Sequence, residues 1–129
     1  MNQKKHILCI EDESEMIELM RLVLEREGFD VTGAVGGEQG LKAMRQKKPD
    51  LILLDLMMPG IDGWEVYRQM RADKELMEIP VIIVTAKAQS IDKVLGLQVA
   101  KVADYITKPF GPKELISSIE RVFAKQKAR

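Results

Sequence analysis

Two short runs of apolar residues constrain the fold more than any other feature of the sequence. The segments Leu51–Asp55 (LILLD) and Val81–Thr85 (VIIVT) carry apolar side chains at consecutive positions rather than at every second one. Strands that helices cover on both faces show this continuous pattern, whereas a strand with one face in water alternates apolar and polar residues. The two runs therefore predict central strands of a parallel sheet that lies between two layers of helices.

Segments of two kinds alternate along the rest of the chain. Three more runs are rich in β-branched or aromatic residues and are predicted as strands: His6–Ile10, Asp30–Ala34 and Asp104–Thr107. A stretch with helical apolar spacing follows each of the five strands. Five strand–helix pairs favour an α/β fold, because right-handed crossovers place helices on both faces of a parallel sheet.

The predicted helices are bounded by residues that commonly start or end helices. In chain order, these residues are Gly28 and Pro49 at the ends of the first two helices, and Asp62, Ser90 and Pro112 at the starts of the last three. The first helix is expected to bury an apolar stripe made of Met16, Leu19, Met20, Val23 and Leu24. The fifth is expected to bury Leu115, Ile119, Val122 and Phe123.

Composition excludes several classes of protein. The 129 residues suit one domain, with a core over about residues 5–124 and a short basic tail at 125–129 that frays. Twenty acidic and twenty basic residues cancel, which argues against direct binding to nucleic acid or to a membrane surface. No apolar run approaches the roughly 20 residues that span a bilayer, and the charged start MNQKKH is unlike a signal peptide. The single cysteine, Cys9, cannot form an internal disulfide, so we expect a cytoplasmic protein.

Chemically active side chains gather where the predicted strands end. The carboxyl ends of parallel strands lie at one edge of the sheet, so residues at those ends come together. They are Glu11, Asp12 and Glu13 after the first strand, Asp55 on the third, Thr85 on the fourth, and Tyr105, Thr107 and Lys108 on the fifth. Carboxylates, hydroxyls and an amine are therefore expected together at one edge.

The acids of this group predict a metal site. Glu11, Asp12 and Asp55 would repel one another unless a cation lies between them. An all-oxygen site with few carboxylates suits Mg²⁺, which keeps several of its own waters. With one oxygen of Asp55 on the metal, the other is free to attack an electrophile, and such carboxylate nucleophiles form aspartyl phosphates. Lys108 would neutralise a transferred phosphoryl group, and Thr85 would reach it after an inward movement of its loop.

Each of these residues also has an ordinary explanation when it is taken alone. Acids after a strand commonly stabilise the amino end of the next helix, and threonine is frequent in strands. An isolated lysine is commonly solvated, and Asp55 by itself could cap a turn. Their joint placement at four strand ends, in chain order, is what favours a site with chemistry.

With these residues in place, the sequence resembles the receiver domain of two-component response regulators over essentially its whole length. The matching motifs are ILCIEDE, DLILLDLMMPGIDGWEV, IPVIIVTA and DYITKPF. The resemblance implies a flavodoxin-like fold, in which five helices cover both faces of a five-stranded parallel sheet in the order 2-1-3-4-5. It also implies a cis bond between Lys108 and Pro109.

The resemblance assigns a role to each residue of the predicted site. The Mg²⁺ ligands would be Asp12 and Asp55 directly, Glu11 through a coordinated water, and the backbone carbonyl of Met57. The phosphoryl group would lie on Asp55 and contact Thr85 and Lys108, with Tyr105 as the aromatic switch residue.

The sequence departs from the family pattern at a few positions. Glu11 stands where aspartate is frequent, and its longer side chain still suits a contact through water. The segment GLQVAKVADY lacks a glycine that is usual before the fifth strand and is one residue longer, which predicts a shifted fourth helix and following loop. Met57 and Lys87 occupy positions that tune acyl-phosphate hydrolysis, and here they predict slow self-dephosphorylation.

The favoured hypothesis is a phosphorylation-controlled switch rather than an enzyme with a separate substrate. A sensor histidine kinase, a phosphotransfer protein or a small acyl phosphate would supply the phosphoryl group. The surface of the fourth helix, fifth strand and fifth helix would then change, and would bind a downstream protein or fused output domain or form a homodimer.

Other functions make different demands on the sequence. A receiver-like docking module that works without phosphorylation stays open. A phosphohydrolase with an aspartyl-phosphate intermediate typically needs a second acid two residues after its nucleophile, where this chain has Met57. Flavin binding needs a phosphate loop rich in serine, threonine or glycine after the first strand, where this chain has acids.

Overall fold

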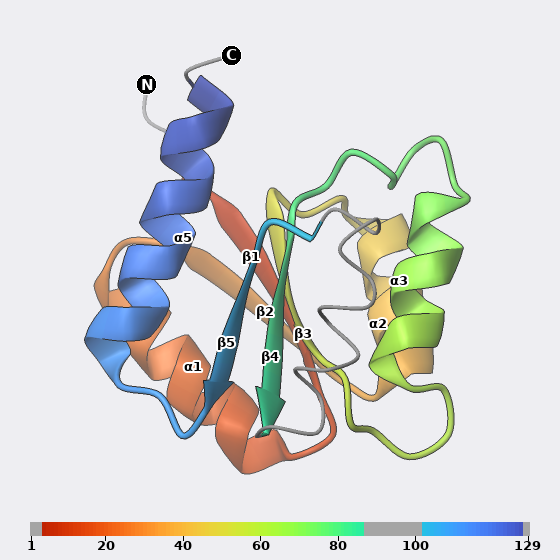
Figure 1. The fold of residues 1–129 in the computed structure, drawn as a ribbon, viewed down its shortest axis with the longest axis horizontal. Helices are drawn as coiled ribbons and strands as arrows, with labels where there is room; N and C mark the ends of the chain where they lie inside the picture. The colour runs from red at the N-terminus through yellow and green to blue at the C-terminus, as the bar shows by residue number, and fades with distance from the viewer. Residues whose placement is uncertain (1–3, 87–101, 128–129) are drawn as a thin grey trace.

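The computed structural model describes residues 4–86 and 102–127 and shows strands alternating with helices (Figure 1). The strands are β1 (His6–Glu11), β2 (Asp30–Val35), β3 (Leu51–Asp55), β4 (Val81–Ala86) and β5 (Asp104–Lys108). The helices within the described residues are α1 (Ser14–Arg26), α2 (Gly37–Gln46), α3 (Gly63–Arg71) and α5 (Pro112–Lys127). All five strands lie within one residue of their predicted bounds. The predicted fourth helix, beginning near Ser90, lies outside the described residues.

The five strands form one parallel sheet between two layers of helices. Its strand order is β2-β1-β3-β4-β5, and every neighbouring pair is parallel. Helices α1 and α5 cover one face, while α2 and α3 lie on the other (Figure 1). This arrangement confirms the expected doubly wound fold and brings the carboxyl ends of β1 and β3, which are neighbours, to the same edge.

The central strands are buried on both faces, as their continuous apolar pattern predicts. Every residue of β3 is buried. Its side chains alternate between the two layers: Ile52 and Leu54 join the core shared with α2 and α3, whereas Leu51 and Leu53 join the core shared with α1 and α5. A strand in this position has no polar face, so the carboxylate at its end is the first polar side chain that it offers.

Helix α1 turns the predicted stripe toward the core except at Leu19. Ile17 is buried together with Met20 and Leu24, whereas Leu19 is 51% exposed, so the prediction that Leu19 belongs to the core is wrong. Residues two positions apart on a helix point in nearly opposite directions, so burying Ile17 turns Leu19 outward. Gly33 on β2 makes this possible, because a Cβ at that position would overlap the side chain of Ile17.

The other helix boundaries follow their predicted signals, with one difference at the end of the chain. The Asp62 side chain accepts a hydrogen bond of 2.9 Å from the backbone N–H of Glu65 and caps α3. Pro112 is the first residue of α5. This helix continues to Lys127 through residues that were expected to fray, because lysine, glutamine and alanine are good helix formers. In the described residues, no helix is long and apolar enough to cross a membrane.

Gly63 lies directly against the end of β3. A Cβ on Gly63 would overlap the backbone carbonyl oxygen of Asp55 and would lie 2.7 Å from the Cα of Leu56. The Gly63 N–H also donates to the carbonyl oxygen of Leu56 at 3.2 Å. The first turn of α3 can approach the strand this closely only without a side chain at position 63.

Two leucines of α1 provide a matched test of the observed stripe. We expect Leu24→Ala to lower the free energy of unfolding by about 2–5 kcal/mol, because the side chain is fully buried and leaves a cavity. Leu19→Ala should change it by less than about 0.5 kcal/mol, because the side chain is exposed. Urea denaturation of both variants measures the difference, and equal losses would contradict the observed orientation of the helix.

Gly63 and Gly111 provide a second matched pair. Gly63→Ala should cost about 1–3 kcal/mol, since the nearest atoms are backbone and cannot move aside without displacing Asp55. Gly111→Ala meets no atom within 4 Å and should be neutral or stabilise the fold by about 0.4–1 kcal/mol. Chemical denaturation gives both values, and backbone amide NMR shifts of residues 54–57 should move only in Gly63→Ala. Shifts that stay in place there would contradict the close approach.

Candidate functional site

The three predicted acids meet at the carboxyl edge of the sheet. Carboxylate oxygens of Glu11, Asp12 and Asp55 all lie within 4.8 Å of one another. Glu11 ends β1 and Asp55 ends β3, and these neighbouring strands hold the two side chains in place. Glu11 is 1% exposed and Asp55 3% exposed, while Asp12 is half-buried. Two of the three carboxylates are therefore almost cut off from water.

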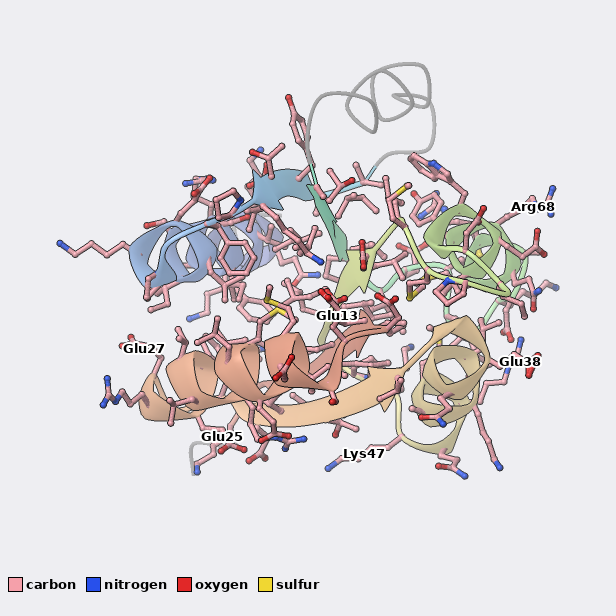
Figure 2. All side chains as sticks on the ribbon, turned by 90° about the horizontal axis from the view of Figure 1, so that it is seen from below. Glu13, Glu25, Glu27, Glu38, Lys47 and Arg68 are labelled. Carbon is pink, nitrogen blue, oxygen red and sulfur yellow. The ribbon has the colours of Figure 1, made fainter. Side chains whose placement is uncertain are left out.

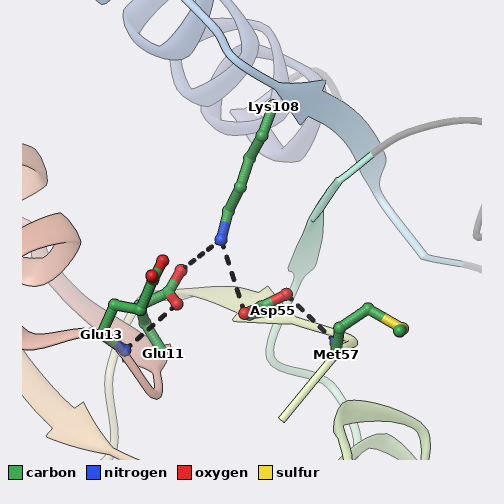
Figure 3. A network of polar contacts seen from close by, with 5 residues as sticks. All are labelled: Glu11, Glu13, Asp55, Met57 and Lys108. Carbon is green, nitrogen blue, oxygen red and sulfur yellow. Dashed lines mark hydrogen bonds and ion pairs between the residues drawn. The ribbon is translucent and has the colours of Figure 1, made fainter.

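Lys108 brings a positive charge to these acids from β5, the strand at one edge of the sheet. Its Nζ lies 2.8 Å from Oε1 of Glu11 and 3.5 Å from Oδ2 of Asp55 (Figure 3). Lys108 ends β5, and the bond to Pro109 is cis, as the family resemblance implies. The ammonium group thus bridges acids from two strands, with its shorter contact to Glu11.

Burial and neighbouring charges shift the pKa values of Glu11 and Lys108. Burial raises the pKa of Glu11 to about 7; the hydrogen bond from Lys108 opposes this rise, and the negative charge of Asp55 adds to it. Burial alone would lower the pKa of Lys108, but the hydrogen bond to Glu11 and the charges of both acids hold it above its usual value. The ammonium group therefore stays charged at neutral pH.

Backbone amides hold the two buried carboxylates in fixed orientations. The N–H of Met57 donates to Oδ1 of Asp55 at 3.1 Å, and the N–H of Glu13 donates to Oε2 of Glu11 at 3.3 Å. The Met57 side chain itself is 58% exposed and extends away from the Asp55 carboxylate (Figure 3). Glu13 lies beside these strand ends, whereas Glu25 and Glu27 lie at the far end of α1 (Figure 2). Of these three glutamates, only Glu13, which precedes α1, lies beside the acid cluster.

The hydroxyl and aromatic residues of the predicted site make no bond to the acids. Thr85 is fully buried, and its Oγ1 has no hydrogen-bond partner among the described residues. Tyr105 lies on the neighbouring strand β5 and is 42% exposed. Thr107 is paired with Thr85 in the register of β4 and β5. Lys87, the predicted lifetime-tuning residue, lies outside the described residues.

The donor atoms at the site suit a hard cation. Glu11, Asp12 and Asp55 offer carboxylate oxygens only, and no nitrogen or sulfur ligand joins their group among the described residues. Hard divalent cations such as Mg²⁺ prefer such oxygens. These three acids could therefore hold Mg²⁺, and the ion would neutralise the charge that Lys108 alone does not balance. The contact of the ion with the backbone carbonyl of Met57 stays a prediction.

Trp64 directly follows Gly63, the residue of α3 that lies against the end of β3. The single tryptophan of the chain is partly buried and packs against the core shared with α2 and α3. Its indole Nε1 is buried without a hydrogen-bond partner among the described residues. A probe that is fixed by packing on one side responds to small changes in the adjoining loop.

Sequence reasoning missed two parts of this arrangement. One is Gly63, whose missing side chain lets α3 pack against Asp55; its position directly after the capping Asp62 was the available signal. The other is the preference of Lys108 for Glu11 over Asp55, for which the sequence carries no signal because it depends on a difference of less than one ångström.

Comparison with known proteins finds matches over most of the chain. The model of the response regulator receiver domain family matches residues 7–120. The alkaline phosphatase synthesis transcriptional regulatory protein PhoP of Bacillus subtilis is 43% identical over 122 residues, which cover 95% of this chain and 49% of that protein. The DNA-binding response regulator MtrA of Mycobacterium tuberculosis is 43% identical over 116 residues, covering 90% of this chain and 49% of that one. This chain thus spans about half the length of these curated relatives.

A solved structure agrees with the fold as well. The crystal structure of a putative response regulator from Chloroflexus aurantiacus has a TM-score of 0.86 and 30% sequence identity, covering 95% of this chain and 99% of that one. The family match extends from β1 into α5 and includes every described residue of the acid–lysine site. The chain belongs to the receiver domain family of two-component response regulators.

Proposed function

We propose that this receiver domain accepts a phosphoryl group on Asp55 in a reaction that requires Mg²⁺. The donor would be a sensor histidine kinase, a phosphotransfer protein or a small acyl phosphate. The observation that carries the proposal is the Asp55 carboxylate itself, 3% exposed at the end of an apolar strand and flanked by Glu11, Asp12 and Lys108. Burying a charge costs free energy, which a residue that only shapes a turn does not require. A carboxylate nucleophile, by contrast, needs its charge.

The proposed phosphoryl transfer would use side chains of this site and one backbone amide. An Asp55 carboxylate oxygen attacks the phosphorus atom and forms the P–O bond, while the P–N bond to a donor histidine breaks and its electron pair stays on the imidazole nitrogen. The backbone N–H of Met57 holds one oxygen of Asp55, which orients the other. The Lys108 ammonium would neutralise charge on the phosphoryl oxygens. Bound Mg²⁺ would supply electrostatic stabilisation of those same oxygens.

A phosphoryl group would act on the rest of the domain through Thr85 and Tyr105. The Thr85 hydroxyl is buried and has no hydrogen-bond partner in the part of the chain that the structure describes, so a new acceptor nearby would draw it. Movement of β4 would open space for the exposed Tyr105 ring to turn inward, changing the surface of β5 and α5. That surface would bind a downstream protein or a fused output domain, or a second copy of the chain. The names of PhoP and MtrA describe transcriptional and DNA-binding regulators, which is consistent with a fused output.

Acetyl phosphate tests the proposed reaction directly. With Mg²⁺ present, the wild-type protein should gain the mass of one phosphoryl group, and Asp55→Asn should gain none, because the amide is not a nucleophile. Asp30→Asn is the matched control, since Asp30 is exposed at the start of β2, away from the site. Intact-protein mass spectrometry measures all three. No gain in the wild type, or a gain that survives Asp55→Asn, would favour a docking module that works without phosphorylation.

The lifetime of the acyl phosphate tests the roles of Met57 and Lys87. We expect Met57→Ala to shorten it several-fold, because the exposed methionine side chain is free to fold over the phosphoryl group and exclude water. Lys87→Ala should also shorten it, by removing a charge that pairs with the phosphoryl oxygens. Loss of radioactive phosphate after donor removal measures both rates. Unchanged or longer lifetimes in both variants would rule out this tuning.

A further inference from the structure

The outer edge of β2 carries backbone groups that point away from the sheet. In the described part of the chain β2 pairs with β1 alone, so its other edge has no neighbouring strand. The Asp30 N–H donates to the carbonyl oxygen of Lys5, just before β1. Because successive residues of a strand direct their backbone groups to opposite sides, Val31, Gly33 and Val35 direct theirs outward. An edge of this kind is a template for another strand.

Two side chains from the flanking helices bind this edge. Arg21 of α1 donates from Nη1 to the carbonyl oxygen of Val31 at 2.9 Å. Gln39 of α2 accepts at Oε1 from the N–H of Val35 at 3.2 Å. Both helices pack against β2, which runs between them in Figure 2. A guanidinium group only donates hydrogen bonds and a side-chain amide oxygen accepts them, so each side chain matches the backbone group that it meets.

Gly33 leaves room for Arg21 to reach the edge. A Cβ on Gly33 would overlap the side chain of Ile17 and would lie 3.5 Å from Nη2 of Arg21. Oxygens of Glu18 and Glu25 lie 3.6 and 3.7 Å from the guanidinium nitrogens and help to hold the group in place. The Arg21 side chain is 33% exposed, so most of it lies against the protein rather than in water.

The edge of β2 is complementary to a second copy of itself. When two β2 strands meet antiparallel about a two-fold axis at Gly33, Val31 of one copy lies opposite Val35 of the other. The Val35 N–H then donates to the carbonyl oxygen of Val31, and the two Gly33 residues pair across the axis. Arg21 and Gln39 therefore occupy an acceptor and a donor that such a pair would join to each other.

We propose that Arg21 and Gln39 close the β2 edge to strand addition, and that a domain without them dimerises through antiparallel pairing of two β2 strands. The partner is a second copy of this chain, because the outward donors and acceptors of β2 match those of a second β2. The strands β2 and β5 are the two end strands of the sheet, so this surface is separate from the β5 and α5 surface of the proposed function. Pairing at β2 requires neither Mg²⁺ nor a phosphoryl group and does not depend on that function.

Sedimentation velocity without Mg²⁺ or a phosphoryl donor tests the proposal. The double variant Arg21→Ala/Gln39→Ala should self-associate at least about tenfold more tightly than wild type, because no side chain then competes with the hydrogen bonds between strands. Arg26→Ala/Gln46→Ala is the matched control, since both residues are exposed at the last positions of the same two helices. The control should stay within about twofold of wild type. Circular dichroism checks that each variant folds.

Val35→Pro distinguishes strand pairing from association elsewhere on the molecule. Added to the double variant, it removes an outward N–H donor and leaves the hydrogen bonds between β2 and β1 in place, since the Val35 N–H points away from β1. Self-association should then return to within about twofold of wild type. Hydrogen exchange measured by NMR should also show the Gly33 N–H of the double variant more strongly protected as the protein concentration rises.

Any of three results would overturn the proposal. They are a double variant that associates within about twofold of wild type, a control that equals the double variant, and a gain that persists after Val35→Pro. Gln39→Ala alone covers the case in which the double variant does not fold, because it changes one exposed residue of α2. This single variant should associate about threefold more tightly than wild type, and the absence of a gain would contradict the closed edge.

Discussion

The structure depends on how two buried carboxylates and one ammonium group share a small space. Glu11 and Asp55 have almost no contact with water, and each would cost several kcal/mol there without a partner. Lys108 supplies one positive charge against three acids, so the metal-free site keeps an excess of negative charge. Under the proposed function, this excess would favour binding of a cation and, through the cation, of a phosphoryl group. The rest of the fold holds Glu11, Asp12, Asp55 and Lys108 in position.

The parallel sheet provides that position through its apolar strands. The side chains of β3 pack into both cores, so its end cannot tilt without disturbing helices on two faces. Gly63 brings the first turn of α3 against the backbone of Asp55, and Asp62 caps the same turn. At the start of β5, the Asp104 carboxylate accepts hydrogen bonds from Ser118 and Arg121 of α5. These bonds hold against α5 the strand that carries Lys108 at its other end. The charges are thus mounted on segments that have little freedom to relax.

Most of the fold could be predicted from local patterns. Continuous apolar runs located the central strands, and the cap at Asp62 and the proline at 112 located two helix starts. The phase of α1 could not be predicted in this way, because Leu19 and Ile17 are equally apolar. Gly33, distant in sequence, decides which of the two is buried. The extension of α5 to Lys127 likewise depends on helix propensity. Residues 125–129 were predicted to be a tail because they are basic, and that criterion takes no account of propensity.

The members of the site could be predicted, but not the bonds between them. Parallel strands that end at one edge bring Glu11, Asp12, Asp55 and Lys108 together whatever their rotamers. Which acid Lys108 contacts more closely depends on side-chain geometry, and sequence spacing does not encode it.

The bond between Glu11 and Lys108 joins residues 97 positions apart and links the first strand to the last. A ribosome would release β1, β3 and their acids well before β5 emerges, since domains are made from the amino end. A nascent chain would therefore hold Asp55 without its lysine, and a truncated chain would do so permanently. The acid–lysine site is therefore complete only after the last strand of the sheet has been made.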